Sequence, residues 1–267
     1  MKYIVTGGCG FIGSNLVDKL INLGHEVTIF DDLSSGKVEN LNEKARFIEV
    51  DISSDDEISE CIDWFDGVDT VFHTAAKARV QPSIIDPITF NKTNVDGTLT
   101  LLKMAVDSGV RRFIYSASSS AYGNTDIFPT PESHPTNPLS PYGAQKLVYG
   151  ERQLLEGAYC LVMGIFVQQR LNNKPMTIRG DGEQRRDFTY VGDVVDANIK
   201  ASQSKNVGNG EVINIGNGDN RSVNQIADMI GGNTINVEPV IEPKETLADN
   251  SKARDLLDWK PTMIIEN

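Results

Sequence analysis

The sequence predicts an α/β protein built on a Rossmann-type, doubly wound parallel sheet, with a smaller C-terminal region. Two observations predict this class. Over the first half of the chain, short apolar runs suited to buried strands alternate with segments whose apolar residues recur at helical spacing. A glycine-rich turn, Thr6-Gly7-Gly8-Cys9-Gly10-Phe11-Ile12-Gly13, joins the first apolar run to the first helical segment. Strands that alternate with helices form parallel sheets with helices on both faces.

Each element of the first half is read from its own pattern. Strands are expected at residues 3–6, 26–30, 46–50, 70–74 and 112–116. Helices are expected at 11–23, which Gly24 ends, and over 84–106. The loops 31–36 and 116–120 follow the carboxyl ends of strands, the edge where open α/β sheets bind ligands. After about residue 150 the elements shorten; 176–178 and 212–215 read as strands and 223–230 as a helix.

Composition excludes several classes of function. The 267 residues hold 25 Lys and Arg against 37 Asp and Glu, a net charge of −12, which argues against a broad nucleic-acid or anionic-membrane surface. Cys9, Cys61 and Cys160 have no paired spacing and no nearby His cluster, so neither a disulfide framework nor a metal site is expected. No apolar stretch reaches membrane-spanning length and no signal peptide is recognisable, so we expect a cytoplasmic protein.

The glycine-rich turn is suited to a dinucleotide. Gly7, Gly10 and Gly13 lack a Cβ, so backbone N–H groups can approach a pyrophosphate at the positive end of a helix. Asp31 lies 18 residues after Gly13, at the end of the second strand. A carboxylate there accepts hydrogen bonds from both adenosine-ribose hydroxyls and repels a 2′-phosphate, so we expect NAD rather than NADP. The alternative is a purely structural glycine turn, with Cys9 as a small space-filling residue.

A second motif carries groups suited to acid–base chemistry. Tyr142 and Lys146 are four residues apart and share one face of a predicted helix. Tyrosine ordinarily titrates near ~10 and is no base at neutral pH, but a neighbouring ammonium favours the phenolate. The hydroxyl-rich segment 116–120 leaves the fifth strand at the ligand edge. Taken alone, the pair could equally be two residues on a surface helix.

Together these motifs resemble the extended short-chain dehydrogenase/reductase family, and within it the UDP-glucose/UDP-N-acetylglucosamine 4-epimerases. The matching pieces span nearly the whole chain in order: 6–13, 31–36, 73–76, 94–98, 116–123, 140–146, 186–188, 214–216 and 247–253. The resemblance implies that Ser118 holds the sugar O4 and relays its proton, that Tyr142 is the base, and that Lys146 tunes Tyr142 and binds the nicotinamide ribose.

The resemblance also implies a binding site for each ligand. The NAD-binding residues would be Gly7, Gly10, Phe11, Ile12, Gly13, Asp31, Asp32, Leu33, Ser35, Gly36, Asp51, Ile52, Thr74, Ala75, Ala76, Asn94, Ser116, Tyr142 and Lys146. Asp51 and Ile52 would flank the adenine, although Asp51 is equally suited to cap a helix. The UDP-sugar would contact Ala78, Arg79, Ser118, Ser119, Ser120, Ala158, Val162, Thr177, Arg179, Arg186, Thr246 and Asp249. Arg186 would meet the diphosphate as a charge-assisted donor.

The implied reaction is epimerisation rather than dehydration. Family dehydratases place an Asp-Glu pair just after the catalytic hydroxyl, whereas this chain has Ser119 and Ser120. The expected course is loss of the O4 proton and of a hydride from C4 to NAD, rotation of a 4-keto sugar, and return of the hydride. Two alternatives remain open: a UDP-uronate epimerase or decarboxylase, with Arg79 or Arg179 reading the carboxylate, and a non-catalytic NAD-binding protein.

The resemblance further implies a domain division, an oligomer and a sugar preference. Residues 1–150 would form the NAD-binding domain, with 187–217 returning to it, and 151–186 and 218–267 the substrate-binding region. A homodimer is expected through the helix over 84–106 and the helix that begins near Tyr142, with Leu99, Leu102 and Val106 at the interface. The alternative is that these apolar residues pack against the chain's own sheet. Thr246 would leave space for a 2-acetamido group that a Tyr would fill, unless it is merely a strand residue.

The chain departs from the family after Lys146. Two residues separate it from the segment 149–153, where relatives continue the helix of Tyr142 and add a sixth strand ending in a Tyr/Phe-Asn pair. A parallel crossover needs at least ~10–12 residues, so helix and strand are not expected to fit together. Either a segment is deleted, which would put catalysis in doubt, or the sequence joins two segments across a stretch that it omits; the clean match on both sides favours the second. Val240 stands where many relatives have a second diphosphate-binding Arg.

Overall fold

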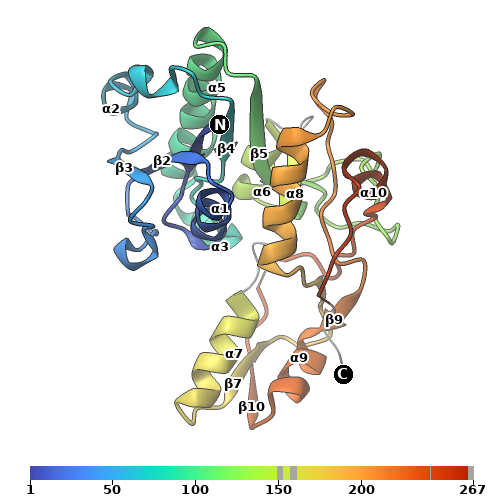
Figure 1. The fold of residues 1–267 in the computed structure, drawn as a ribbon. Coiled ribbons are helices and arrows are strands. Elements are labelled where there is room, and N and C mark those ends of the chain that lie inside the picture. The colour runs from blue at the N-terminus through green and yellow to red at the C-terminus, as the bar shows by residue number, and fades with distance from the viewer. Residues whose placement is uncertain (149–152, 157–160, 241, 264–267) are drawn as a thin grey trace.

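A parallel sheet lies at the centre of the larger lobe (Figure 1). The computed structural model describes residues 1–148, 153–156, 161–240 and 242–263. The six strands run in the order β3-β2-β1-β4-β5-β6, which is the Rossmann order with the topological switch between β1 and β4. Their bounds are β1 (Lys2–Thr6), β2 (Glu26–Asp31), β3 (Arg46–Glu49), β4 (Thr70–His73), β5 (Arg112–Ser118) and β6 (Gln153–Glu156).

Strand register brings the ends of four strands to one edge. Thr6 of β1 pairs with Phe30 of β2 and with His73 of β4, and His73 pairs with Tyr115 of β5. The residues that follow this row therefore meet at the carboxyl edge of the sheet. The loops after β1, β2, β4 and β5, which contain the predicted ligand-binding residues, all begin at this edge.

Helices cover both faces of this sheet, as the strand pattern requires. Tyr3 and Val5 of β1 pack in a core shared with α1 and α8, whereas Ile4 between them packs on the opposite face with residues of α5. The helical elements of this lobe are α1 (Phe11–Asn22), η1 (Val38–Asn40), α2 (Asp55–Ser59), η2 (Ile62–Phe65), α3 (Val80–Ile85), α4 (Pro87–Asn91), the π-helix η3 (Lys92–Gly97), α5 (Thr98–Asp107), η4 (Ser119–Ala121), α6 (Pro141–Val148), α8 (Val191–Gln203) and α10 (Ser251–Leu257).

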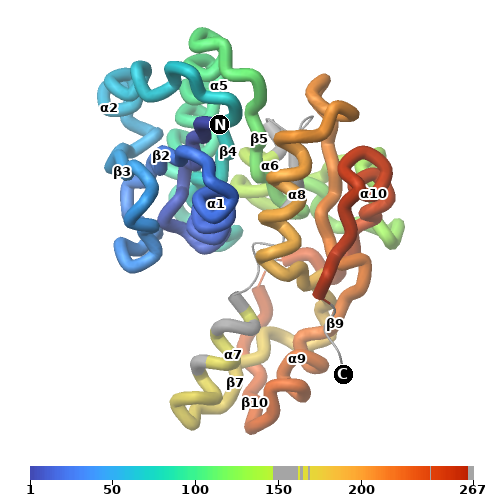
Figure 2. Tube along the Cα trace, viewed as in Figure 1, coloured from blue at the N-terminus to red at the C-terminus, as the bar shows by residue number. Residues whose placement is uncertain are grey.

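The smaller lobe is built from later segments, drawn in yellow and orange in Figure 2. It contains α7 (Leu161–Leu171), β7 (Met176–Arg179), β8 (Arg185–Asp187), β9 (Asn220–Ser222), α9 (Val223–Ile230) and β10 (Thr234–Val237). Strands β10 and β7 pair in parallel and β8 and β9 antiparallel. Phe166, Met176 and Ile226 are its most deeply buried apolar side chains, so this lobe has its own small core.

The end of the described chain returns to the larger lobe. Trp259 is 1% exposed and its Nε1 donates to the Asp193 carbonyl of α8 at 2.8 Å, while the Asp193 carboxylate accepts from the Thr262 amide at 2.9 Å. Together with α10, Trp259 packs in the same core as α1 and β1. Strand β6 also joins the large sheet. The domain ranges given above stay a prediction, and these two segments lie against the sheet although they fall in the range assigned to substrate binding.

Three expectations about elements are wrong. The predicted helix over 84–106 is interrupted, because Asp86 caps a new helix that starts at Pro87, and a π-helix follows at Lys92–Gly97. Residues 212–215 form no strand; Ile213 and Ile215 instead pack in the core beside α8. After Lys146, helix α6 and strand β6 both fit, because the crossover that joins β5 to β6 begins at Ser119 and is long enough to contain the helix.

Within the described ranges, no helix is both long and apolar enough to cross a membrane. Cys9 and Cys61 are buried free thiols, and Cys160 lies outside the described residues.

Candidate active site

The turn between β1 and α1 requires glycine for reasons of contact as well as conformation. Gly7 has φ +69°, and a Cβ on it would lie 2.7 Å from the Ala75 backbone nitrogen. A Cβ on Gly13 would lie 2.1 Å from the Gly7 carbonyl oxygen, so α1 packs directly on the turn. Helix α1 begins after Gly10 with no side-chain cap, so no side chain competes with a ligand for its first amides. This is the geometry of a phosphate cradle.

Asp31 stands at the end of β2, beside this cradle. Its carboxylate accepts from the Cys9 and Leu33 amides, both at 2.9 Å, and the side chain is 7% exposed. Burial raises the pKa of Asp31, and the two amide bonds oppose that effect. Burial, with Asp31 nearby, also raises the pKa of the Cys9 thiol to about 11, so Cys9 stays protonated at neutral pH and serves as a packing residue.

A cavity of about 530 Å³ runs along the carboxyl edge of the sheet from this cradle. It is lined by most of the residues expected to bind the cofactor: Gly7, Gly10, Phe11, Ile12, Gly13, Asp31, Asp32, Ser35, Ile52, Thr74, Ala75, Ala76, Ser116, Tyr142 and Lys146. Ala78 and Arg79, expected at the substrate, also line it. The Ser116 hydroxyl, buried in this wall, has no hydrogen-bond partner among the described residues. The glycine cradle, the carboxylate at the end of β2 and this free hydroxyl fit a dinucleotide.

Four expected cofactor residues do not line the cavity. Leu33 and Gly36 back Asp31: the Leu33 amide binds its carboxylate, and a Cβ on Gly36 would lie 2.7 Å from Asp31 Oδ1. The Asp51 carboxylate accepts from the amide and hydroxyl of Ser53, at 2.8 and 2.7 Å, and so stabilises a turn. Asn94 lies behind the wall and binds the backbone of Lys77.

Sequence reasoning missed several lining residues: Phe30, Ser34, Val50, Lys77, Phe90, Thr93 and Ala117. Lys77 directly follows two Ala residues that were expected there, so its position after β4 could have identified it. Phe90 and Thr93 lie on the segment that bends at Pro87 and η3, and a single straight helix gave no reason to place them at the cofactor.

Tyr142 and Lys146 lie on one buried face of α6 and both line the cavity. The Tyr142 amide donates to the Ser83 hydroxyl at 3.1 Å. Lys146 Nζ donates to the Ser116 carbonyl at 3.0 Å and lies 4.7 Å from the centroid of the Tyr115 ring, a cation–π contact. That ring stacks on His73 at 5.5 Å. Complete burial, with Lys146 nearby, lowers the pKa of His73 to about 3, so this imidazole is neutral.

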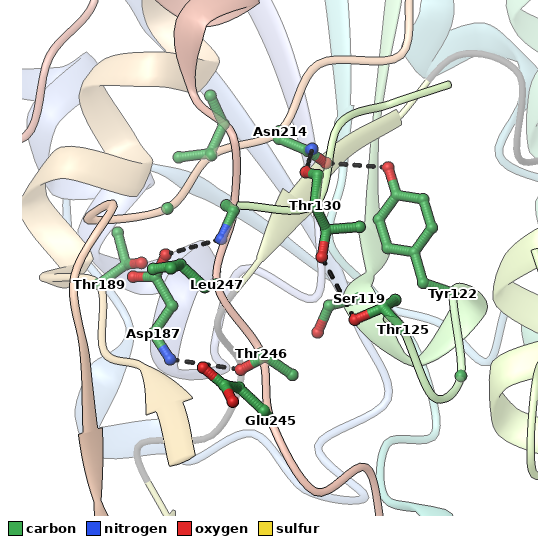
Figure 3. A pocket seen from close by; sticks show the side chains of 14 residues that line it. Ser119, Tyr122, Thr125, Thr130, Asp187, Thr189, Asn214, Glu245, Thr246 and Leu247 are labelled. Carbon is green, nitrogen blue, oxygen red and sulfur yellow. Dashed lines mark hydrogen bonds between the residues drawn. The ribbon is translucent and has the colours of Figure 1, made fainter. Parts of the chain in front are cut away.

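A second, smaller cavity of about 50 Å³ lies beyond the end of β5 (Figure 3). Ser119 lines it on one side and Thr246 on the other, while Ser116 and Ala117 line the large cavity. The last residues of β5 and the turn after it therefore face both cavities. Ser118, between them in sequence, is fully buried and its Oγ accepts from the Ser120 amide at 3.2 Å. Ser120 is also buried and lines neither cavity.

The small cavity has a rigid polar wall that sequence reasoning did not assign. The Tyr122 hydroxyl donates to Asn214 Oδ1 at 3.0 Å, and Asn214 Nδ2 donates to the Thr130 carbonyl at 2.9 Å (Figure 3). Burial raises the pKa of Tyr122 to about 12, so Tyr122 is a donor and not a base. Opposite, the Asp187 carboxylate accepts from the amides of Asn217, Gly218 and Ala248. Asn214 belongs to the segment 214–216, one of the pieces that resemble the family, and this resemblance could have identified it as a site residue.

The remaining described residues that were expected at the substrate line neither cavity. Arg186 is 8% exposed and donates to Glu242 at 2.5 Å and to the Arg185 carbonyl at 2.8 Å. Thr177 bonds through its hydroxyl and amide to the Gln169 side chain in the smaller lobe. Val162, Arg179 and Asp249 line neither cavity, and Ala158 lies outside the described residues. Their assignments stay predictions.

Comparison with known proteins agrees with this geometry. The model of the NAD dependent epimerase/dehydratase family matches residues 3–156 and 147–216. A protein of Methanocaldococcus jannaschii described as a putative UDP-glucose 4-epimerase is 37% identical over 289 aligned positions, which cover 97% of this chain and 92% of that protein. Because 289 positions exceed the 267 residues here, that relative has residues that this chain lacks. The two family matches overlap at 147–156, directly after Lys146.

Solved structures give the same result. The crystal structure of UDP-glucose 4-epimerase with UDP-glucose from Thermotoga maritima is 37% identical, with a TM-score of 0.90 over 99% of this chain and 95% of that one. UDP-N-acetylglucosamine 4-epimerase from Methanobrevibacter ruminantium, in complex with UDP-N-acetylmuramic acid, is 32% identical, with a TM-score of 0.87 over 98% and 93%. With its glycine cradle, the carboxylate at the end of β2 and a Tyr and Lys facing the same cavity, this chain belongs to the NAD-dependent epimerase/dehydratase family, and its cofactor is NAD.

Proposed function

We propose that this protein inverts C4 of a UDP-hexose, interconverting UDP-N-acetylglucosamine with UDP-N-acetylgalactosamine, and UDP-glucose with UDP-galactose. The observation that carries the proposal is that Tyr142 and Lys146 line the same cavity as the cradle and Asp31, while Ser119, three residues after Ser116 of that cavity, lines the small cavity. A sugar whose C4 meets Tyr142 would have its ring beside the end of β5. Relatives whose names include UDP-sugar 4-epimerase support the same reaction.

Each group of the site has a role that follows from its chemistry. Tyr142, as phenolate, takes the O4 proton and later returns it, and Lys146 stabilises that phenolate through its positive charge. NAD, when bound, supplies a reversible hydride acceptor. Accepting from the Ser120 amide uses one lone pair of Ser118 Oγ, so its O–H can still donate to O4 in the proposed relay. Since neither Ser119 nor Ser120 ionises at neutral pH, the site has no acid–base pair at these positions for eliminating water.

The small cavity supports acceptance of an N-acetyl sugar. An acetamido group has three more non-hydrogen atoms than the hydroxyl that it replaces. A water-sized group needs about 10–15 Å³ of such space, so a cavity of about 50 Å³ has room for these atoms. Thr246 forms part of its wall and its Oγ accepts from the Asp187 amide at 3.3 Å. A Tyr in its place would occupy the cavity.

The test is turnover of UDP-N-acetylglucosamine by the purified protein with NAD, followed through the anomeric proton signals by NMR. We expect UDP-N-acetylgalactosamine to form. Thr246→Tyr should suppress this reaction roughly ten- to a hundredfold, since overpacking costs about 1–3 kcal/mol, and should spare UDP-glucose. Thr234→Tyr on exposed β10 is the matched control. Turnover of UDP-glucose but not of its N-acetyl counterpart by the wild type would refute the sugar assignment.

A second candidate is a UDP-uronate epimerase or decarboxylase. The observation that favours it is Arg79, whose exposed side chain lines the large cavity and could read a carboxylate. Including UDP-glucuronate among the substrates decides between the two, since a uronate enzyme should prefer it by orders of magnitude. If NAD binds and no UDP-sugar turns over, the protein is instead a non-catalytic NAD-binding protein and the proposal fails.

A further inference from the structure

Gln145, between Tyr142 and Lys146 on α6, makes contacts that the proposed reaction does not use. Its side chain is 6% exposed, its Oε1 accepts from Asn94 Nδ2 at 3.2 Å, and its Nε2 donates to the Pro87 carbonyl at 3.2 Å. Asn94 in turn binds both backbone groups of Lys77: its Oδ1 accepts from the amide at 2.8 Å, and its Nδ2 donates to the carbonyl at 2.9 Å. One side chain of α6 is therefore tied to α4, to η3 and to the segment after β4.

The donors and acceptors of this cluster allow only one arrangement. The Lys77 amide can only donate, so Asn94 presents its oxygen there and its two N–H groups to Lys77 O and to Gln145. Gln145 must then present its oxygen to Asn94 and its nitrogen to the Pro87 carbonyl. A side chain of the same shape as Gln145 but without its N–H donor would leave the buried Pro87 carbonyl without a hydrogen bond. An unsatisfied polar group is costly in a dry environment.

The same cluster continues to the strand that carries the glycine cradle. The Thr98 hydroxyl donates to the Asn94 carbonyl at 2.8 Å, and therefore accepts from His73 Nε2, also at 2.8 Å. His73 is neutral, so its Nδ1 accepts from the Thr6 hydroxyl at 2.6 Å, and that hydroxyl accepts from the Ala75 amide. Side chains at most 6% exposed thus link α6 to β1 through η3, α5 and β4.

Helix α6 depends on such contacts because it is short. Eight residues are too few for an isolated helix to be stable in water, so tertiary contacts set its position. The two family matches overlap from the last residues of this helix to residue 156, and at least one relative has residues that this chain lacks. The first turns of α6 are thus the part that can fix Tyr142 and Lys146.

We propose that Gln145 is a positioning residue, which through Asn94 and Pro87 holds Tyr142 and Lys146 at a fixed distance from the cofactor cradle. This inference rests on the proposed function only for its kinetic test. Losing the two bonds allows α6 to shift against η3, and a displacement of about 1 Å at reacting groups lowers a rate by roughly a hundredfold. Gln145→Met keeps the shape and removes both bonds.

The kinetic test compares Gln145→Met, Gln145→Glu and the control Ala144→Gln, whose side chain lies on the exposed face of the same helix. For Gln145→Met we expect kcat to fall roughly ten- to a hundredfold, with NAD retained and KM within a few-fold of wild type. Gln145→Glu should lose more at neutral pH, because its carboxylate cannot donate to the Pro87 carbonyl. Protonation restores that donor, so the activity of Gln145→Glu relative to wild type should rise as pH falls, whereas the Gln145→Met ratio stays flat.

Other ionisable groups adjoin this contact: Lys146 next to Gln145, Lys77 beside Asn94, and Asp86 next to Pro87. These groups are the same in all variants, so the ratio of variant to wild-type activity reports on residue 145 alone. Equal falls in kcat for Ala144→Gln and Gln145→Met, or an unchanged kcat in Gln145→Met, would overturn the proposal.

A measurement without turnover separates this inference from the proposed function. Hydrogen exchange of NAD-bound protein, read by mass spectrometry over the peptide containing residues 140–148, should be at least tenfold faster in Gln145→Met than in wild type or Ala144→Gln. Unchanged exchange would refute the positioning role. If no UDP-sugar is turned over yet exchange accelerates as expected, the proposed function fails and the anchoring of α6 by Gln145 stands.

Discussion

Replacing Gly13 by Ala should damage the cofactor site through contact alone. The added Cβ would lie 2.1 Å from the Gly7 carbonyl oxygen and 2.8 Å from the Gly8 Cα, against an ordinary contact of 3.4 Å or more. Both neighbours are backbone, so the start of α1 must move outward by more than 1 Å. Overpacking of this kind costs about 1–3 kcal/mol, and about 2–4 °C of Tm accompanies each kcal/mol in a protein of this size. We expect Tm to fall by roughly 2–12 °C.

The same displacement should weaken the binding of NAD. Moving the first amides of α1 by 1 Å breaks a hydrogen bond to a charged phosphate, worth about 1.5–3 kcal/mol, so Kd should rise roughly ten- to a hundredfold. Calorimetric titration of cofactor-stripped protein with NAD measures this Kd. The matched control is Gly24→Ala, where φ is +79° and nothing lies within 4 Å: it should lose stability but keep its NAD affinity. Wild-type affinity in Gly13→Ala would refute the close packing of α1 on the cradle.

Four further predictions concern separate features. Tyr142→Phe should lower turnover by a factor of about 10²–10⁴ with NAD still bound, because only the base is lost; an unchanged rate would remove Tyr142 from the mechanism. Asp31→Ala should weaken the binding of NAD and relax the rejection of NADP; an unchanged ratio of the NAD and NADP affinities in binding assays would contradict the ribose assignment. Leu99 and Val106 are 56% and 68% exposed, so we predict a homodimer in light scattering that Leu99→Lys disrupts; a wild-type monomer at micromolar concentration would exclude it. For His73, the folded-state pKa of about 3 lies below the ordinary 6.5, so its contribution to stability is complete above pH 6.5 and is lost as pH falls toward 3; denaturant titrations in which a His73→Gln variant keeps the same pH slope would contradict this.

The parts of the fold that sequence could predict are those with a local cause. The alternation of Tyr3, Ile4 and Val5 between two buried faces defines β1, and the glycine spacing after it indicates the turn into α1, where Gly13 packs on Gly7. Tyr142 and Lys146 share a face because a helix places residues four apart together. In each case, residues within one short segment determine the result.

The parts that sequence missed depend on contacts between distant segments. Apolar spacing over 84–106 suggested one helix, but the Asp86 side chain caps a new one at Thr89, and Asn94 bonds to Lys77, 17 residues away. Arg186 pairs with Glu242, 56 residues further on, while its role at the diphosphate stays a prediction. No local pattern encodes such a partner, because Glu242 lies in an irregular segment where no periodicity fixes the direction of its side chain.

The return of the chain end to the first core has a consequence for synthesis on the ribosome. The first five strands are complete at Ser118, but α8, which covers one face of the sheet, is complete only about 85 residues later. At about 5–20 residues per second this interval lasts roughly 4–17 s, and Trp259 emerges later still. Throughout it, the apolar side chains of β1 and β5 that α8 will cover remain without their neighbour. We therefore expect the nascent chain to expose this apolar face for longer than a protein whose covering helices immediately follow their strands.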